Sequence, residues 1–291
     1  EHLRQGESGD IVHCDGSGRC RTFTRDGLGY ASPDGQFAVL HDRADGSLAL
    51  RYPDGLILTF DGFRGTPTDG ALLSVEDRHG NVQRYLYDDQ GLLTDVVDTL
   101  GRSISYEYDP SGRITRLSDF TGRELAFAYD ADDHLTSMRS PAVTGTPTGN
   151  DFPEGKTTSY SYSTGFDDGR LNHNLLTITD ARGQTWLTNT YSNEPDDPDI
   201  SLTFDRVVRQ DVGGTNDTGV SAGGTVSFSY EPLNSGAEPW NPDLKRRRSI
   251  VTDPNGNVSE HDMNANGHEL TEVLRTRGLR ADDPESFRTE R

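Results

Sequence analysis

The most regular feature of the chain is a pair of aromatic residues that recurs between residues 77 and 135. One residue separates the two rings of each pair, as in Tyr85-Leu86-Tyr87. Residues two apart lie on the same face of a β-strand, so each pair predicts a strand with one aromatic face. The pairs recur every 21 residues, at Tyr85 and Tyr87, Tyr106 and Tyr108, and Phe127 and Tyr129.

An Asp-x-x-Gly segment precedes each pair and predicts a tight turn. An aspartate side chain bonds its own backbone in such turns, and glycine takes a positive φ without steric cost. A second turn follows each pair, so one unit is strand, turn, strand, turn. The residues of the first turn are Asp77 and Gly80, Asp98 and Gly101, and Asp119 and Gly122.

Stacking of these units predicts ladders of apolar side chains that run across neighbouring strands. The first rings form one ladder and the second rings form another, while Leu93, Ile114 and Leu135 form a third. Such cross-strand pairs contribute roughly 0.2–1 kcal/mol each beyond simple burial. The pattern therefore predicts an all-β fold in which each repeat is stabilised by its neighbours.

Weaker copies of the unit continue to about residue 278, separated by insertions rich in Gly, Pro, Asn and Asp. Longer turns are tolerated because the entropy of loop closure grows slowly with length. We assign residues 71–291 to about seven repeats, with the series cut off at the C-terminus. Residues 1–70 carry Asp-Gly steps between short apolar runs, which predict a meander of β-hairpins leading into the repeats. The best helical candidate is 282–291, where Pro284 can open a short turn.

The amino-acid composition does not decide the fold, but it restricts the classes of partner that the chain can bind. Only 31% of the residues are hydrophobic, and about a fifth are Leu, Ile, Val or Phe, at the border of disorder. The net charge of −20 disfavours nucleic acid and anionic lipid as partners. No stretch reaches the roughly 18–20 apolar residues of a membrane-spanning helix, so we expect no membrane insertion.

The two cysteines, Cys14 and Cys20, flank a segment rich in Gly, Asp and Ser. A turn between two strands brings such residues within bonding distance, which indicates a disulfide and an oxidising compartment. Two unpaired core thiols are the alternative. The spacing does not fit the paired Cys-x-x-Cys of a zinc site.

The Tyr-Asp-x-x-Gly units, preceded by the Tyr52-Pro53-Asp54-Gly55 hairpin, resemble the YD-repeat (Rhs, rearrangement-hotspot) family. That family includes bacterial Rhs proteins, shell subunits of insecticidal toxin complexes and animal teneurins. The resemblance implies a long sheet that spirals into a solenoid or hollow shell, secreted or displayed on the cell surface. The self-cleaving aspartyl-protease region that closes many Rhs shells has no counterpart in this sequence, so toxin encapsulation is not carried over.

Catalytic motifs find little support, and one calcium pattern is present. The chain contains no Gly-x-Ser-x-Gly elbow, no Gly-x-x-x-x-Gly-Lys loop and no His-Glu-x-x-His. Asp262, Asn264 and Asn266 match positions 1, 3 and 5 of a calcium loop, with Gly267 at position 6. Position 12 is Val273, which lacks the carboxylate of that position, and the same residues also fit a repeat turn.

We therefore expect a non-enzymatic structural segment of a secreted or cell-surface bacterial protein, acting in surface display, adhesion or self-assembly. One alternative is a shell fragment of an Rhs-type toxin-encapsulating protein. Another is a carbohydrate-binding module that uses the long loops and Trp240. The expected partners are other segments of a longer chain, copies of the chain, or a cell-surface glycan or protein. No cofactor is expected apart from the calcium considered above.

Overall fold

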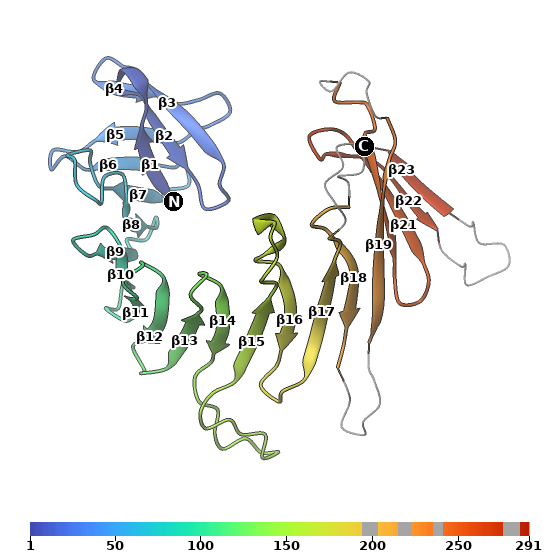
Figure 1. Ribbon diagram of the computed structural model, residues 1–291. Coiled ribbons are helices and arrows are strands. Elements are labelled where there is room, and N and C mark those ends of the chain that lie inside the picture. The colour runs from blue at the N-terminus through green and yellow to red at the C-terminus, as the bar shows by residue number, and fades with distance from the viewer. Residues whose placement is uncertain (194–202, 215–222, 235–240, 276–285, 291) are drawn as a thin grey trace. The chain divides into compact units, whose positions relative to one another are not determined.

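The computed structural model describes residues 1–193, 203–214, 223–234, 241–275 and 286–290 (Figure 1). The chain forms two compact units, Glu1–Phe127 and Ala128–Arg291. The sequence-based division near residue 70 therefore falls inside the first unit.

The predicted all-β class is confirmed. Over the described ranges the regular structure consists of β-strands and two three-residue 3-10 turns, η1 (Glu7–Gly9) and η2 (Gly169–Leu171). The described residues contain no helix with the length and apolar character needed to cross a membrane. Within each unit the strand pairings of the described residues are antiparallel and join consecutive strands, which is the arrangement that short turns impose.

The first unit begins with a meander of short strands that form a small sheet in chain order. Its strands are β1 (His2–Gln5), β2 (Ile11–Cys14), β3 (Cys20–Asp26) and β4 (Gly29–Ala31). An isolated bridge between His2 and Ala71 ties this sheet to the chain that follows.

A longer antiparallel series completes the first unit. Its strands are β5 (Val39–Asp42), β6 (Leu48–Arg51), β7 (Ile57–Phe60), β8 (Leu72–Glu76), β9 (Val82–Tyr87), β10 (Leu93–Val97), β11 (Ser103–Tyr108), β12 (Ile114–Asp119) and β13 (Glu124–Tyr129). Strand β13 crosses the division between the two units.

The hydrophobic core lies between the meander and the start of this series. Phe23 of β3 and Phe60 of β7 are completely buried, and Leu48 and Leu50 on one face of β6 join them. Apolar residues at alternate strand positions build this two-layer core. Its members are Leu3, Ile11, Phe23, Ala38, Leu40, Leu48, Leu50, Leu58, Phe60 and Leu72.

The second unit continues with strands of the same kind. They are β14 (Leu135–Arg139), β15 (Thr157–Tyr162), β16 (Leu175–Thr179), β17 (Thr185–Tyr191), β18 (Val207–Val212), β19 (Gly224–Pro232), β20 (Arg247–Thr252), β21 (Val258–Met263), β22 (Glu269–Arg275) and β23 (Ser286–Glu290). The helical candidate at 282–291 is wrong for Ser286–Glu290, because these residues pair with β22 as a strand. Its other residues lie outside the described ranges.

A β-bulge recurs beside the second aromatic position of the repeat. Tyr87 pairs with Leu93 and the next pair is Leu86 with Asp95, so Thr94 is the extra residue on the outgoing strand. Register shifts at the same place occur opposite Phe60, Tyr108, Tyr162, Tyr191 and Met263. A bulge bends its strand and increases the local twist. Repetition of the bulge therefore gives each repeat sheet a repeated curvature, which the sequence pattern did not predict.

Candidate functional site

The second ring of the aromatic pair bonds to the backbone of an earlier strand. The hydroxyl of Tyr108 donates to the carbonyl oxygen of Leu93 at 2.7 Å, and that of Tyr87 donates to Leu72 at 2.8 Å. The acceptor in each case is the first residue of a strand, next to a bulge, and the same bond joins Tyr162 to Leu135 and Tyr230 to Val207. Burial raises the pKa of Tyr87 to about 12, so this hydroxyl stays a donor at ordinary pH.

The first ring of the pair faces an apolar residue on the next strand. Tyr85 pairs with Val96 and Tyr106 pairs with Leu117, and Tyr85 also packs against the hydrophobic core. Phe127 and Tyr129 are half-buried on β13, on either side of the division between the units. The structural role of the six rings stays a prediction, and these contacts support it.

The predicted turns share one hydrogen-bond pattern, which Asp98 illustrates. Its Oδ1 accepts from the backbone amides of Leu100 and Arg102, each at 2.9 Å. Its Oδ2 accepts from Nε of Arg102 at 2.7 Å, while Gly101 takes a φ of 78°. The Arg102 backbone amide and side chain hold the pKa of Asp98 below its usual value. Asp77 and Asp119 are held in the same way, with Gly80 and Gly122 at positive φ.

The fifth residue of the turn is a partner that sequence reasoning missed. It donates from its side chain to Oδ2 of the aspartate, as Arg113 does to Asp109 and Asn257 does to Asp253. The available signal was the donor side chain that six of the turns carry four residues after the aspartate, although the Asp88 turn has Leu92 there: Asn81, Arg102, Arg113, Arg123, His134 and Asn257.

Cys14 and Cys20 form the predicted disulfide. They are cross-strand partners on β2 and β3, with Cα atoms 4.0 Å apart. The turn between them is closed by Asp15, whose Oδ1 accepts from the backbone amides of Ser17 and Arg19. The disulfide therefore closes a hairpin that the turn already defines.

The residues of the calcium pattern take other roles. The buried carboxylate of Asp262 bonds to Nζ of Lys245 at 3.0 Å and to Nε of Arg248 at 2.7 Å. Oδ1 of Asn264 accepts from the backbone amides of Asn266 and His268, as the aspartate does in the other turns. These contacts account for the Asp262 and Asn264 side chains without a cation, and Asn266 lies exposed in the turn.

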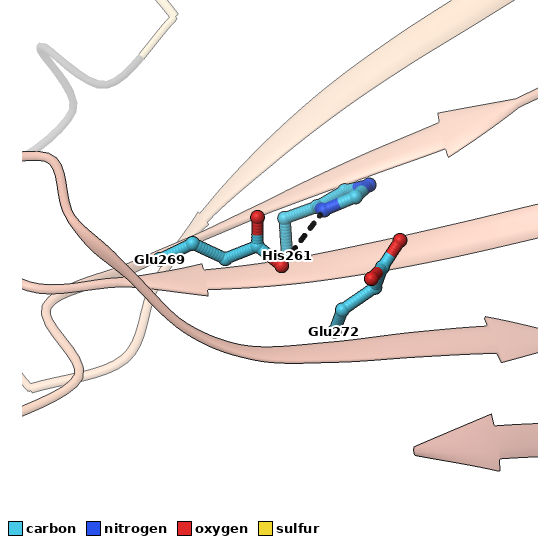
Figure 2. A group of neighbouring side chains, drawn as sticks. All are labelled: His261, Glu269 and Glu272. Atoms are coloured by element: carbon cyan, nitrogen blue, oxygen red, sulfur yellow. Dashed lines mark ion pairs between the residues drawn. The ribbon is translucent and has the colours of Figure 1, made fainter. Parts of the chain in front are cut away.

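A different group gathers three potential metal ligands on the same hairpin (Figure 2). His261 lies on β21, and Glu269 and Glu272 lie on β22. One ligand atom from each lies within 4.8 Å of the others, and Nδ1 of His261 is 3.7 Å from Oε1 of Glu269. Nε2 of His261 is 3.0 Å from the hydroxyl of Ser259, which orients the ring. The sequence analysis did not identify this group.

The second unit also contains a cavity of about 380 Å³ beside the segment 163–174, which joins β15 to β16. Aromatic and amide side chains line it, among them Tyr162, Phe166, Tyr191 and Asn189. The Tyr162 ring stacks on His134 with the ring centroids 4.4 Å apart.

His134 belongs to a chain of hydrogen bonds next to this cavity. Its Nδ1 is 2.9 Å from Oδ2 of Asp130, and its Nε2 is 2.6 Å from Nδ1 of His173. His173 has a positive φ of 77°. Trp240, which the sequence singled out as a sugar-stacking candidate, lies outside the described residues.

Comparison with known proteins identifies the repeat. Residues 87–124 match the family model of the RHS repeat. No curated protein matches the chain.

Several solved structures are similar to the chain. One is the crystal structure of TcdB2-TccC3, at 13% identity and a TM-score of 0.44 over 94% of this chain and 15% of that one. Another is the Photorhabdus luminescens Tc holotoxin pore, at 13% identity and a TM-score of 0.22 over 92% of this chain and 18% of that one. The chain thus spans less than a fifth of the length of these structures. The match to the RHS repeat over residues 87–124 confirms the resemblance that the 21-residue period indicated.

Proposed function

We propose that this chain is an architectural segment of a secreted or cell-surface RHS-repeat protein, with no enzymatic role. The observation that carries the proposal is that the characteristic tyrosine and aspartate side chains of the repeat form hydrogen bonds to the backbone. The tyrosine hydroxyls bond to the backbone of the preceding repeat, as Tyr108 does to Leu93. The aspartates bond to their own turns, as Asp98 does. The side chains that define the repeat are thus engaged in holding the sheet together.

The disulfide supports the proposed location. Disulfides persist in oxidising compartments, and the Cys14–Cys20 bond closes a hairpin near the start of the first unit. Secretion or surface display provides such an environment. The proposed partners are other segments of the same longer chain or further copies of it, because stacked repeats are stabilised by the next repeat.

Electron microscopy of the assembly isolated from its source tests the proposal. Surface display, adhesion or self-assembly predicts extended or filamentous particles in the culture supernatant or on cells. The alternative, a toxin-encapsulating shell, predicts closed hollow particles with internal density. Particles confined to the cytoplasm of intact cells would contradict the extracellular role in either form.

The cavity in the second unit favours a second candidate, the binding of a cell-surface glycan. Aromatic rings and amides such as Tyr191 and Asn189 line it, and rings of this kind stack on sugars while amides bond to hydroxyl groups. A glycan array probed with the chain tests this role. Signals that Tyr191→Ala removes and Tyr85→Ala retains would support it, whereas an array without signal would exclude it for the glycans displayed.

A further inference from the structure

The group of His261, Glu269 and Glu272 occupies three positions that are aromatic or aliphatic in most other repeats, the polar Asn189–Gln210 pair being an exception. His261 is two residues before Met263, as Tyr85 is before Tyr87 and Tyr106 is before Tyr108. The cross-strand partner of His261 is Glu272, where Tyr85 has Val96 and Tyr106 has Leu117. An aromatic–aliphatic pair is thus replaced by an imidazole and a carboxylate.

Glu269 replaces the third apolar residue of the same repeat. It is the first residue of β22 and pairs with Met263, just as Leu93 pairs with Tyr87 and Ile114 pairs with Tyr108. All three ladder positions have therefore changed together into side chains that bind metals. Exposure to solvent alone would allow any polar residue at these positions and does not account for one imidazole and two carboxylates.

The recurring bulge brings the two glutamates to one face. Glu269 and Glu272 are three residues apart, and side chains at that spacing point to opposite faces of a regular strand. In β22 the register shifts between the Met263–Glu269 and Asp262–Thr271 pairs, so Leu270 is the extra residue. A bulge re-aims the side chain next to it, which accounts for the clustering of His261, Glu269 and Glu272 in Figure 2.

The carboxylates of this group lie in a partly buried setting. The side chains of His261 and Glu269 are 23% and 22% exposed. Arg248 of the neighbouring strand instead binds Glu260 and Asp262, which lie on the opposite face of β21 because they alternate with His261. Lys245 also binds Asp262. The positive charges of Arg248 and Lys245 therefore bind carboxylates on the face of the hairpin opposite His261.

We propose that His261, Glu269 and Glu272 bind a divalent transition-metal ion, of which Zn²⁺ is the representative. Zinc takes imidazole nitrogen and carboxylate oxygen at about 2.0–2.2 Å, so its ligand atoms lie about 3.4 Å apart. The 3.7 Å between Nδ1 of His261 and Oε1 of Glu269 needs only a small adjustment to reach that geometry. An imidazole ligand favours zinc over calcium or magnesium.

The remaining contacts fit this assignment. The Ser259 hydroxyl at Nε2 holds the ring with Nδ1 toward Glu269, the outer-sphere support typical of histidine ligands. Three protein ligands leave one position of a tetrahedral ion for water or for a group from a partner. The bound ion would link β21 to β22 where the apolar ladder is interrupted.

Calorimetric titration of the metal-free chain with Zn²⁺ tests the proposal. We expect one equivalent to bind and to raise the melting temperature. The matched control is the triple variant His261→Tyr, Glu269→Leu and Glu272→Val, which restores the apolar residues of the repeat that begins at Asp77. This variant should fold and lose at least 100-fold in affinity. A single Glu272→Gln change, close to isosteric, should lose at least the roughly 10–100-fold in Zn²⁺ affinity that loss of an outer-sphere partner costs, and it guards against misfolding of the triple variant.

Two further outcomes decide the assignment. A His173→Ala variant should bind Zn²⁺ as the unaltered chain does, because the proposed site does not include the His134–His173 pair, whose imidazole nitrogens offer an alternative site within the described residues. Equal binding by the unaltered chain and by Glu272→Gln would overturn the proposal, as would no binding at pH 7.5. The second result would point to Arg247, which lies opposite Met263, as the countercharge of the carboxylates.

Discussion

The start of the first unit and the repeats that follow it are stabilised in different ways. Phe23 and Phe60 of the core are completely buried, and every member of their cluster lies between residues 3 and 72. In the repeats, by contrast, the strands β10 and β12 are half-buried at every position. One chain thus combines a two-layer apolar core with sheets whose apolar residues are only partly covered.

The difference shows what the repeat uses in place of burial. Each unit adds cross-strand pairs, a turn closed by an aspartate, and a tyrosine hydroxyl bonded to the preceding repeat. Each of these contributes about 1 kcal/mol or less, so stability accumulates with the number of units. The core, in contrast, concentrates its stability in a few large side chains. Substitutions and deletions in the two regions should therefore have different effects.

The largest expected effect is the difference between deleting one whole repeat and deleting part of a repeat. Deletion of residues 98–118 removes one 21-residue period and joins Val97 to Asp119, which begins an equivalent turn. The shortened chain should fold with nearly unchanged strand content. Deletion of 98–107 removes a turn and a strand and should abolish cooperative unfolding. Circular dichroism with thermal melts measures both, and equal melting of the two deletions would contradict the repeat model.

Truncation of the core comes next. Phe23→Ala should reduce the free energy of unfolding by about 3–5 kcal/mol, because it leaves a cavity among fully buried residues. Chemical denaturation monitored by fluorescence measures the loss. A loss below that of Tyr108→Ala would show that the core and the repeats do not differ as described.

Truncation of a ladder ring should cost less. Tyr108→Ala is expected to lower the free energy of unfolding by about 2 kcal/mol, since the ring is half-buried and carries one hydrogen bond. The same denaturation experiment measures it. An unchanged midpoint would remove Tyr108 from the structural ladder.

Loss of the hydroxyl alone isolates the bond between repeats. Tyr108→Phe should lower the free energy of unfolding by about 1 kcal/mol, because the Leu93 carbonyl loses its donor. Tyr106→Phe is the matched control, since no hydrogen bond of the Tyr106 hydroxyl is found among the described residues. Equal losses in the two variants would argue against the interpretation.

The smallest expected effect per residue is the loss of stability at low pH. The hydrogen bonds of the turns lower the pKa values of Asp77, Asp98, Asp109 and Asp253 from 3.8. A carboxylate with a depressed folded-state pKa stabilises the fold above its unfolded pKa and loses that contribution as the pH falls through the folded value. The free energy of unfolding should therefore stay level from pH 7 to 5 and decline below about pH 4. A shallower decline of the free energy of unfolding in the Asp98→Asn variant would confirm that the turn aspartates cause the loss of stability.

Several elements follow from local sequence alone. The strands and turns between residues 77 and 135, and the Cys14–Cys20 hairpin, depend on residues close in the chain, so their spacing is enough to predict them. The strand at Ser286–Glu290 was missed because its pairing with β22 outweighs a local helix signal.

The candidate metal group of His261, Glu269 and Glu272 shows that local spacing does not predict which side chains form a site. The sequence pointed to Asp262, Asn264 and Asn266, whose spacing suits a calcium loop. In the structure Asp262 lies on one face of β21 and is bound by Lys245, while His261 lies on the other face. The ligand set became visible only through the pairing of β21 with β22.

By itself the sequence determined the period, the turns and the all-β class, because each depends on side chains within a few residues of one another. Only the tertiary structure decided where the strands bulge, which carbonyl each tyrosine reaches and which side chains converge at His261. These features depend on the register between strands. A shift of one residue in register moves a side chain to the other face, and local spacing does not specify that shift.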